Sequence, residues 1–178
     1  MEIRTATPDD APVIREIYRP YVESTVITFE YETPSEEELR RRIGATLSSY
    51  PYLVATESGK IMGYAYAGPF KEREAYRWAV ELSVYVRDDA RGKGTGRLLY
   101  GELFPILLRM HVTNVNACIS YPDSGSVAFH EKLGFHTVAH FTKCGYKFGS
   151  WRDMVWMEKC IAEHPVPPLP FVPFRDLS

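Results

Sequence analysis

Short segments in which apolar and polar residues alternate recur along the whole chain. A period of two is typical of a strand whose two faces meet different surroundings. The longest such segment, residues 78–86, places Val80 and Leu82 on one face and Glu81 and Ser83 on the other. Together with short apolar runs, this pattern predicts strands at residues 3–6, 52–56, 60–67, 78–86, 115–119, 136–142 and 154–159.

Apolar residues spaced three and four apart, with capping signals before them, predict about four helices. The first follows residues 7–10, where a threonine, a proline and acidic residues mark a helix start. The second follows Pro34 and runs to about Ser49, and the third follows a glycine-rich loop at residues 92–96. The fourth begins at Ser124 or Ser126, reaches Lys132 and ends at Gly134. Residues 25–31 fit either a short strand or a loop packed on an apolar surface.

This order of strands and helices predicts an α/β fold with a mixed central sheet of six or seven strands flanked by about four helices. A length of 178 residues fits one domain of ordinary size. Five prolines between residues 165 and 173 favour an extended chain at the C-terminus. We therefore expect one domain at residues 1–162 and a proline-rich tail at residues 163–178.

The charge balance argues against two classes of partner. The chain has 23 acidic and 21 basic residues, a formal net charge of −2, so neither a nucleic acid nor a membrane surface is expected to bind it by bulk electrostatics. No apolar signal region or membrane span is evident, and three cysteines without a C-x-x-C pair suit reduced thiols, so a cytoplasmic protein is expected. His111, His136, His140 and Cys118 do not have the spacing of a zinc site, and no metal is expected.

A glycine-rich basic loop follows the strand at residues 78–86. It reads Arg91-Gly92-Lys93-Gly94-Thr95-Gly96-Arg97, and bare backbone N–H groups in such a loop suit a phosphate. The spacing fits neither the P-loop nor the G-x-G-x-x-G dinucleotide motif. A solvated turn before an amphipathic helix is the alternative interpretation of this run by itself.

Glu81 lies in the middle of the strand that leads into this loop. A carboxylate there is most often an exposed side chain or a salt-bridge partner. Its distance from the loop favours a catalytic role, because Glu81 precedes Arg91 by ten residues, of which five or six are extended at about 3.3 Å each. A ligand whose phosphate binds in the loop would need an extended arm of about this length to reach Glu81.

A second segment, residues 122–135, reads P-D-S-G-S-V-A-F-H-E-K-L-G-F. By itself it is a capped amphipathic helix with a glycine stop, and His130 would lie at the edge of the core. Together with the R-G-x-G-x-G loop, however, it resembles the two acetyl-coenzyme A segments of the GNAT acetyltransferase superfamily.

The likeness extends over essentially the whole chain to the phosphinothricin and methionine sulfoximine acetyltransferase branch. It is carried by residues 27–30, 63–70, 75–78, 81–86, 129–131 and 147–153, and the proline-rich tail is similar to that of some phosphinothricin acetyltransferases. The resemblance implies a single-domain GNAT fold, acetyl-coenzyme A as cosubstrate and a homodimer. It also implies detoxifying activity of the kind that gives herbicide resistance.

For residues that match the motifs of the family, the resemblance implies specific roles. Glu81 matches the general base and His130 the active-site histidine. Asp123 stands where the family usually has asparagine, which removes an amide donor and adds a negative charge. The acceptor pocket is expected at Lys71, Glu72, Arg73, Glu81, Leu82 and Ser83. Coenzyme contacts are expected at Val84, Tyr85, Val86, Arg91, Gly92, Lys93, Gly94, Thr95, Gly96, Arg97, Asp123 and Ser126.

The expected reaction is transfer of an acetyl group to the α-amine of a small amino-acid analogue such as phosphinothricin, methionine sulfoximine or methionine sulfone. Two alternatives stay open: a GNAT enzyme acting on a peptide N-terminus or a polyamine, and a non-catalytic acyl-coenzyme A binding module. Lys71 and Arg73 favour an anionic acceptor over a polyamine. His130 is expected to protonate the leaving sulfur, to hold a water molecule or to serve the structure alone.

Overall fold

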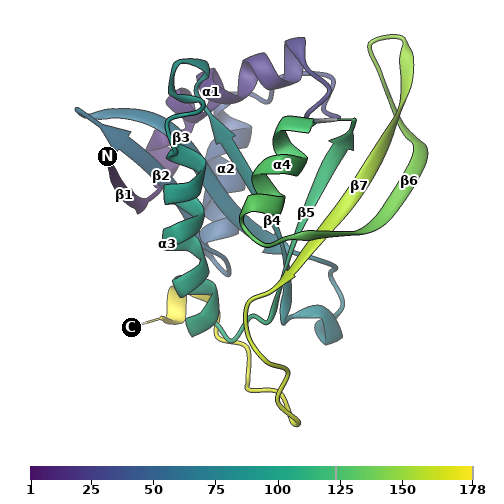
Figure 1. The fold of residues 1–178 in the computed structure, drawn as a ribbon. Coiled ribbons are helices and arrows are strands. Elements are labelled where there is room, and N and C mark those ends of the chain that lie inside the picture. The colour runs from purple at the N-terminus through teal and green to yellow at the C-terminus, as the bar shows by residue number, and fades with distance from the viewer. Residues whose placement is uncertain (123, 178) are drawn as a thin grey trace.

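The computed structural model describes residues 1–122 and 124–177, without the side chain of Ser124. In these residues seven strands form one mixed sheet in the order β1-β2-β3-β4-β5-β7-β6 (Figure 1). Only β4 and β5 run parallel, and the other neighbours are antiparallel. The strands are β1 (Glu2–Thr5), β2 (Tyr52–Glu57), β3 (Lys60–Pro69), β4 (Ala79–Val86), β5 (Asn114–Tyr121), β6 (His136–Lys147) and β7 (Ser150–Cys160).

Helices cover both faces of the sheet, which confirms the predicted α/β architecture (Figure 1). Two of them, α1 (Ala11–Ser24) and α2 (Glu36–Leu47), pack on one face, where Ile14, Ile43 and Tyr64 are buried together. The other face carries α3 (Thr95–Arg109) and α4 (Ser124–Lys132), and its core includes Leu99 and Leu103.

The predicted alternation along β4 decides which side chains enter the core. Val80 and Leu82 are 0% and 4% exposed and pack in the cluster beneath α3. Glu81, Ser83 and Tyr85 must therefore point to the opposite face, toward α1 and the segment that follows it. The polar side chains of β4 are thus displayed on one face only.

β4 and β5 separate at Glu81. Their parallel register pairs Ala79–Glu81 with residues 114–116 and ends there, although β4 stays paired with β3 as far as Val86 and β5 with β7 as far as Tyr121. We call this opening between residues 82–86 and 117–121 the fork; the two strands diverge there in Figure 1. At its mouth the Tyr21 hydroxyl donates to the Val86 carbonyl at 2.6 Å and accepts from the Val86 N–H at 3.1 Å. A side chain of α1 thus takes the place of a strand partner.

The predicted bounds of the last two strands need revision. β6 and β7 extend to Lys147 and Ser150, whereas the sequence pattern predicts strands that end at residue 142 and begin at residue 154. The pairing register of β6 and β7 shifts between Phe141 and Gly145, which interrupts the alternation of apolar and polar residues. Beyond the shift, β6 remains a strand because it stays paired with β7. Residues 25–31 form a loop of bends, the second of the two structures that the pattern allows.

The proline-rich segment packs against the end of the domain. Val172 donates its backbone N–H to the Met110 carbonyl at 3.1 Å, and Phe174 does the same to Ser49 at 2.9 Å. Phe171, Phe174 and Leu177 lie against the core beneath α3. The tail therefore closes the bottom of the molecule as seen in Figure 1.

Candidate active site

A cavity of about 540 Å³ lies between the glycine-rich loop, α4 and the mouth of the fork. We call it the loop cavity. Gly92 and Gly94 line it with φ angles of +73° and +85°, a left-handed conformation that other residues rarely adopt. The loop turns there, and Gly94 then serves as the N-cap residue of α3. The remaining lining residues are Tyr21, Ile27, Val84, Val86, Ala90, Arg91, Thr95, Gly96, Arg97, Gly125, Ser126 and Phe129.

Gly96 lines the same cavity for a different reason. A Cβ atom at this position would lie 3.2 Å from Cζ of Phe129, so the missing side chain lets the α4 ring pack on the first turn of α3. The N-terminal end of α3, with its unpaired N–H groups and partial positive charge, thus opens into the cavity. This geometry suits an anion such as a pyrophosphate.

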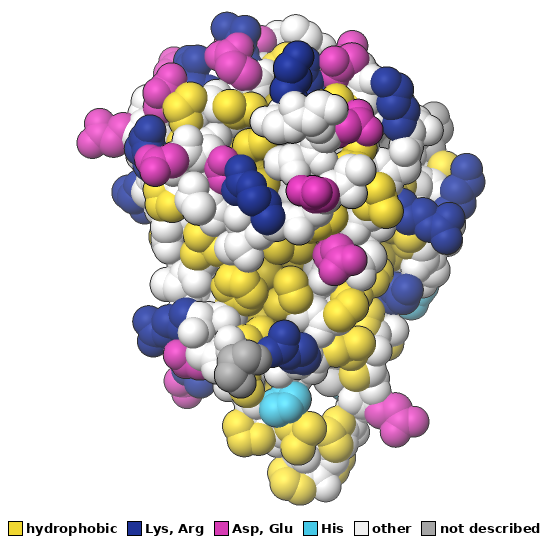
Figure 2. Space-filling model, turned by 90° about the vertical axis from the view of Figure 1, so that its left-hand side faces the viewer, with side chains coloured by type: hydrophobic (Ala, Val, Ile, Leu, Met, Phe, Trp, Pro, Cys, Tyr) yellow, Lys and Arg dark blue, Asp and Glu magenta, His cyan; other side chains and the backbone are white. Residues whose placement is uncertain are grey.

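The charges around the loop cavity are local. Arg91 lies 4.8 Å from the ring of Tyr21 and 3.1 Å from the carboxylate of Asp88, and its side chain is about half exposed. On the face that lies at the left of Figure 1, Figure 2 shows Lys and Arg side chains interspersed with Asp and Glu, while hydrophobic side chains gather across the middle and at the bottom. The cavity therefore offers cations without a broad basic surface.

A second cavity, of about 230 Å³, lies on the other face of β4, and we call it the Glu81 cavity. Ile27 lines both cavities, so they adjoin at this residue. β4 contributes Glu81, Ser83 and Tyr85, and the rest of the wall consists of Ile27, Thr28, Phe29, Cys118, Ser120 and Met154.

Burial governs the protonation of Glu81. Desolvation raises the pKa of its carboxyl, and the nearby Lys71 ammonium opposes part of that rise. Among the described residues none donates a hydrogen bond to this carboxylate. A carboxylate with a raised pKa and free lone pairs is suited to accept a proton from a bound amine.

Alternation also decides which backbone groups face the fork. The Val80 carbonyl accepts from the side-chain amide of Asn116 on β5. The N–H and C=O of Val86 point to the same side, where both bind the Tyr21 hydroxyl. The N–H and C=O of Val84, which lies between them, share that direction, whereas those of Tyr85 point toward β3. Of the expected strand contacts at residues 84–86, Val84 therefore presents its backbone to the fork, and Val86 is engaged by Tyr21.

His130 is not among the described residues that line either cavity; it lies in the core between α3 and α4, directly behind Ser126 and Phe129 of the loop cavity. Its side chain is 3% exposed and touches the rings of Tyr100, Phe129 and Phe135. Its Nδ1 lies 2.8 Å from the Ser126 carbonyl, which only accepts, so Nδ1 carries the proton. In the neutral ring Nε2 is then the acceptor for the Tyr100 hydroxyl at 3.2 Å. The structure does not bring His130 beside Glu81.

The other expected acceptor residues fall into two groups. Lys71 is near Glu81 and lies over the rings of Phe70 and Trp156, and Ser83 lines the Glu81 cavity. Glu72 and Arg73 are exposed and are not among the described residues that line that cavity. Leu82 is directed into the core on the opposite face because β4 alternates. Asp123 lies outside the described residues.

Six lining residues of the Glu81 cavity were not among the expected site residues, and a seventh, Tyr85, was expected as a coenzyme contact. Three come from the α1–α2 loop, two from β5 and one from β7, so their approach depends on the sheet order rather than on spacing along the chain. The available signal was the apolar Ile27 and Phe29 in a segment that fits a loop, since such residues need a surface to pack on. The six are Ile27, Thr28, Phe29, Cys118, Ser120 and Met154.

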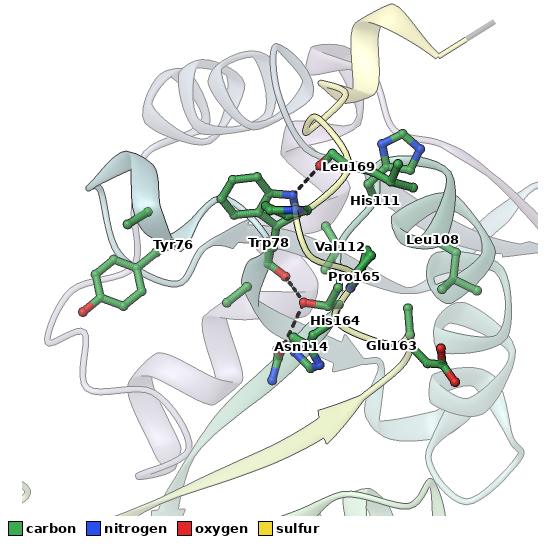
Figure 3. A pocket seen from close by; sticks show the side chains of 15 residues that line it. Tyr76, Trp78, Leu108, His111, Val112, Asn114, Glu163, His164, Pro165 and Leu169 are labelled. Atoms are coloured by element: carbon green, nitrogen blue, oxygen red, sulfur yellow. Dashed lines mark hydrogen bonds between the residues drawn. The ribbon is translucent and has the colours of Figure 1, made fainter.

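A third cavity, of about 340 Å³, lies beneath the start of β4 and β5 and is closed by the tail (Figure 3). The Trp78 indole donates to the Leu169 carbonyl at 2.7 Å, and His164 Nε2 lies 2.6 Å from Asn114 Oδ1. These polar groups hold the tail in place. The cavity is at the opposite end of β4 from the glycine-rich loop.

The model of the acetyltransferase (GNAT) domain family matches residues 3–156. The chain belongs to the GNAT acetyltransferase family. Within it, the chain is 35% identical over 177 residues to phosphinothricin N-acetyltransferase of Streptomyces viridochromogenes, covering 99% of this chain and 96% of the relative. It is 34% identical over 168 residues to the L-methionine sulfoximine/L-methionine sulfone acetyltransferase of Salmonella typhimurium, covering 94% and 98%.

Solved structures of GNAT acetyltransferases share the fold. The protein YncA of Salmonella typhimurium, solved with acetyl-CoA, has a TM-score of 0.88 and 34% identity, and the match covers 93% of this chain and 96% of that one. A phosphinothricin acetyltransferase of Sinorhizobium meliloti, also with acetyl-CoA, has a TM-score of 0.88 and 36% identity, covering 95% and 92%. These matches confirm both the family and the branch that the sequence resembles.

Within residues 1–122 and 124–177, no group of three or more His, Cys, Asp or Glu side chains is arranged to hold a metal ion. No helix of the described chain is long and apolar enough to cross a membrane.

Proposed function

We propose that this protein transfers an acetyl group from acetyl-CoA to the α-amine of a small amino-acid analogue, with phosphinothricin, methionine sulfoximine and methionine sulfone as the candidate acceptors. The main support for this proposal is the pair of adjoining cavities at the fork, one at a glycine-rich helix start and the other around the buried Glu81. The names of the relatives support the choice of acceptors.

The loop cavity is the proposed site for acetyl-CoA. Backbone N–H groups of residues 92–96 and the cations of Arg91, Lys93 and Arg97 would hold the pyrophosphate. The backbone of Val84 would guide the pantetheine arm into the fork. Ser126 on α4 lines the same cavity, and we propose it as a further contact.

Glu81 is the proposed general base. An amine with a pKa of about 9 to 10 is mostly protonated at pH 7, and making it neutral costs roughly 3 to 4 kcal/mol at 1.36 kcal/mol per pKa unit. Glu81 would take that proton directly or through water, and the neutral amine nitrogen would then attack the thioester carbonyl. As the C–N bond forms and the C–S bond breaks, the nitrogen would lose a second proton, which passes to the sulfur so that coenzyme A leaves as the thiol. The burial that raises the pKa of Glu81 makes it a stronger base for this step.

Lys71 is the proposed partner for the anionic part of the acceptor. Its ammonium is near Glu81, above the rings of Phe70 and Trp156. A cation at this place favours an acceptor with a carboxylate or phosphinate over a polyamine, which carries several positive charges.

For His130 we propose a structural role rather than that of a proton donor to sulfur. Its Nδ1 proton is engaged by Ser126 and its Nε2 faces Tyr100, so the ring ties the middle of α4 to α3. Since Ser126 also lines the loop cavity, His130 would act on catalysis through the position of α4.

We also propose a homodimer that works in the cytoplasm, as the family resemblance implies. The β6–β7 hairpin exposes large apolar side chains, including Phe141, Phe148 and Trp151, which favours a contact between copies. Light scattering on the purified protein measures the mass directly, and a mass of 20.4 kDa at micromolar concentration contradicts the dimer.

The decisive experiment measures coenzyme A release with a thiol reagent for each of the three acceptors. We expect acceptor-dependent release with at least one of them, and mass spectrometry of the product should show acetylation at the α-nitrogen. If coenzyme A is released with none of the three acceptors but is released with a peptide N-terminus or a polyamine, the acceptor belongs to that substrate class instead. Acetyl-CoA binding without release for any amine would indicate a binding module.

A further inference from the structure

The end of the β6–β7 hairpin contacts the α1–α2 loop. The hairpin rises beside this loop in Figure 1, although the two segments are more than 100 residues apart in sequence. The loop supplies Ile27, Thr28 and Phe29 to the wall of the Glu81 cavity. Whatever holds the loop therefore shapes that cavity.

Three consecutive hairpin residues contact the loop. A Cβ atom at Gly145 would lie 2.3 Å from the ring of Phe29, so the glycine leaves the space that this ring occupies. The Tyr31 hydroxyl donates to the Tyr146 carbonyl. Lys147 donates from Nζ to the Thr28 carbonyl at 2.8 Å.

Lys147 is the most unusual of these contacts. Its side chain is 1% exposed, and its ammonium lies 5.0 Å from the centre of the Phe148 ring. An ammonium is expensive to bury unless acceptors and opposite charge replace its water. The Thr28 carbonyl supplies one such acceptor.

The surroundings of Lys147 fit a charged lysine. Burial lowers the pKa of its ammonium, and the negative charge of Glu30 opposes that shift. Glu30 is itself held by Arg42, whose Nη1 lies 2.6 Å from Oε1, and by the Tyr18 hydroxyl at 3.3 Å. The cation is therefore set in a network that links the hairpin to α1 and α2.

Thr28 is tied from both sides. Its carbonyl meets Lys147, while its hydroxyl lies 2.7 Å from that of Tyr18 on α1 and accepts from the Glu30 N–H at 3.3 Å. The bond to Tyr18 and the turn at Glu30 are local to the first part of the chain. Among the hydrogen bonds of Thr28 in the described chain, only the bond from Lys147 connects this residue to a strand of the sheet.

We propose that Lys147 is a positioning residue for the acceptor: it sets the wall formed by Ile27, Thr28 and Phe29 by holding the Thr28 carbonyl. This assignment rests on the proposed function in so far as the Glu81 cavity takes the acceptor. Lys147 itself is not among the described residues that line that cavity, so its effect is exerted through the loop.

The test compares two lysines that each donate to a backbone carbonyl beside an aromatic ring. Lys147→Met keeps the length of the side chain and removes its charge and donors. Lys159→Met is the matched control, because Lys159 donates to the Leu133 carbonyl at 2.7 Å and lies 5.1 Å from the Phe104 ring, away from the Glu81 cavity. Lys147→Arg keeps a cationic donor and serves as the rescue variant.

For Lys147→Met we expect KM for the acceptor to rise about 10-fold, the scale of a lost hydrogen bond to a charged group, with KM for acetyl-CoA changed less than about threefold. Hydrogen exchange of the amides in residues 27–31, measured without substrates, should accelerate about 10-fold. Lys159→Met should change neither quantity, and Lys147→Arg should restore most of the acceptor affinity.

Unchanged exchange at residues 27–31 in Lys147→Met overturns the proposal, and so does an equal rise of acceptor KM in Lys159→Met. Lys147→Gln, which keeps a neutral donor, replaces Lys147→Met if the latter does not fold. The exchange measurement is independent of catalysis. If the wild-type protein acetylates none of the acceptors, the proposed function fails while exchange still decides the role of Lys147.

Discussion

The two cavities at the fork differ in how their walls are distributed along the chain. Most of the loop cavity comes from one continuous stretch, from Val84 to Arg97, closed by α4. The Glu81 cavity combines the α1–α2 loop with three strands, from Ile27 to Met154. A site formed by the backbone of one continuous segment can be predicted from the sequence. A site formed by side chains from distant segments depends on the order of the strands in the sheet.

Replacement of the proposed base should produce the largest effect and should separate the two cavities. In Glu81→Gln the carboxylate that accepts the amine proton is lost, so kcat/KM for the acceptor should fall at least about 100-fold. Acetyl-CoA affinity, measured by calorimetry, should stay within about twofold. Glu72→Gln is the control, since Glu72 is exposed outside the cavity. Retention of full activity by Glu81→Gln would falsify the general-base assignment.

A change in the glycine-rich loop should have the opposite signature. Gly94 has a φ angle of +85° at the start of α3, so Gly94→Ala strains the loop by about 1 to 2 kcal/mol and should raise KM for acetyl-CoA about 10-fold. KM for the acceptor should change little.

The matched control for this variant is in the same helix. A Cβ atom added at Gly101 would point into open space without meeting another part of the protein, and the φ angle of this residue is not left-handed. Gly101→Ala should therefore stabilise α3 by about 0.5 to 1 kcal/mol and leave acetyl-CoA binding unchanged. Equal behaviour of the two variants would show that backbone conformation at Gly94 is unimportant for the coenzyme.

The smallest expected effect is a shift in the pH profile of kcat/KM, which tests the environment of Glu81. Glu81 acts only when deprotonated, so kcat/KM should rise with pH through its pKa, which burial places above the ordinary value. Lys71 lowers this pKa, so Lys71→Met should move the acidic limb of the profile to higher pH. An acidic limb that stays in place in Lys71→Met contradicts the electrostatic coupling of the two residues.

Several features of the fold could be predicted because they depend on local pattern. The alternation from Val80 to Ser83 identifies the buried and polar faces of β4, and the glycine-rich loop is placed correctly before α3. The hairpin end at Gly145 could not be predicted in this way, since its strand character comes from pairing with Arg152 and not from alternation.

The same distinction applies to the candidate site. The position of Glu81 on the polar face of its strand follows from the period of two, but its place at the fork follows from the end of the β4–β5 ladder. His130 matches a motif, yet the rings around it and its bonds to Ser126 and Tyr100 depend on how α4 packs on α3.

The sequence by itself determined the alternation of strands and helices, the glycine-rich helix start and the resemblance to GNAT acetyltransferases, because each is carried by neighbouring residues. Only the tertiary structure decided that β4 and β5 part at Glu81, that Ile27, Thr28 and Phe29 line the cavity around it, and that the Lys147 ammonium donates to the Thr28 carbonyl. The physical reason is range. Backbone conformation and periodicity act over a few residues, whereas a cavity exists only where segments far apart in the chain are packed together.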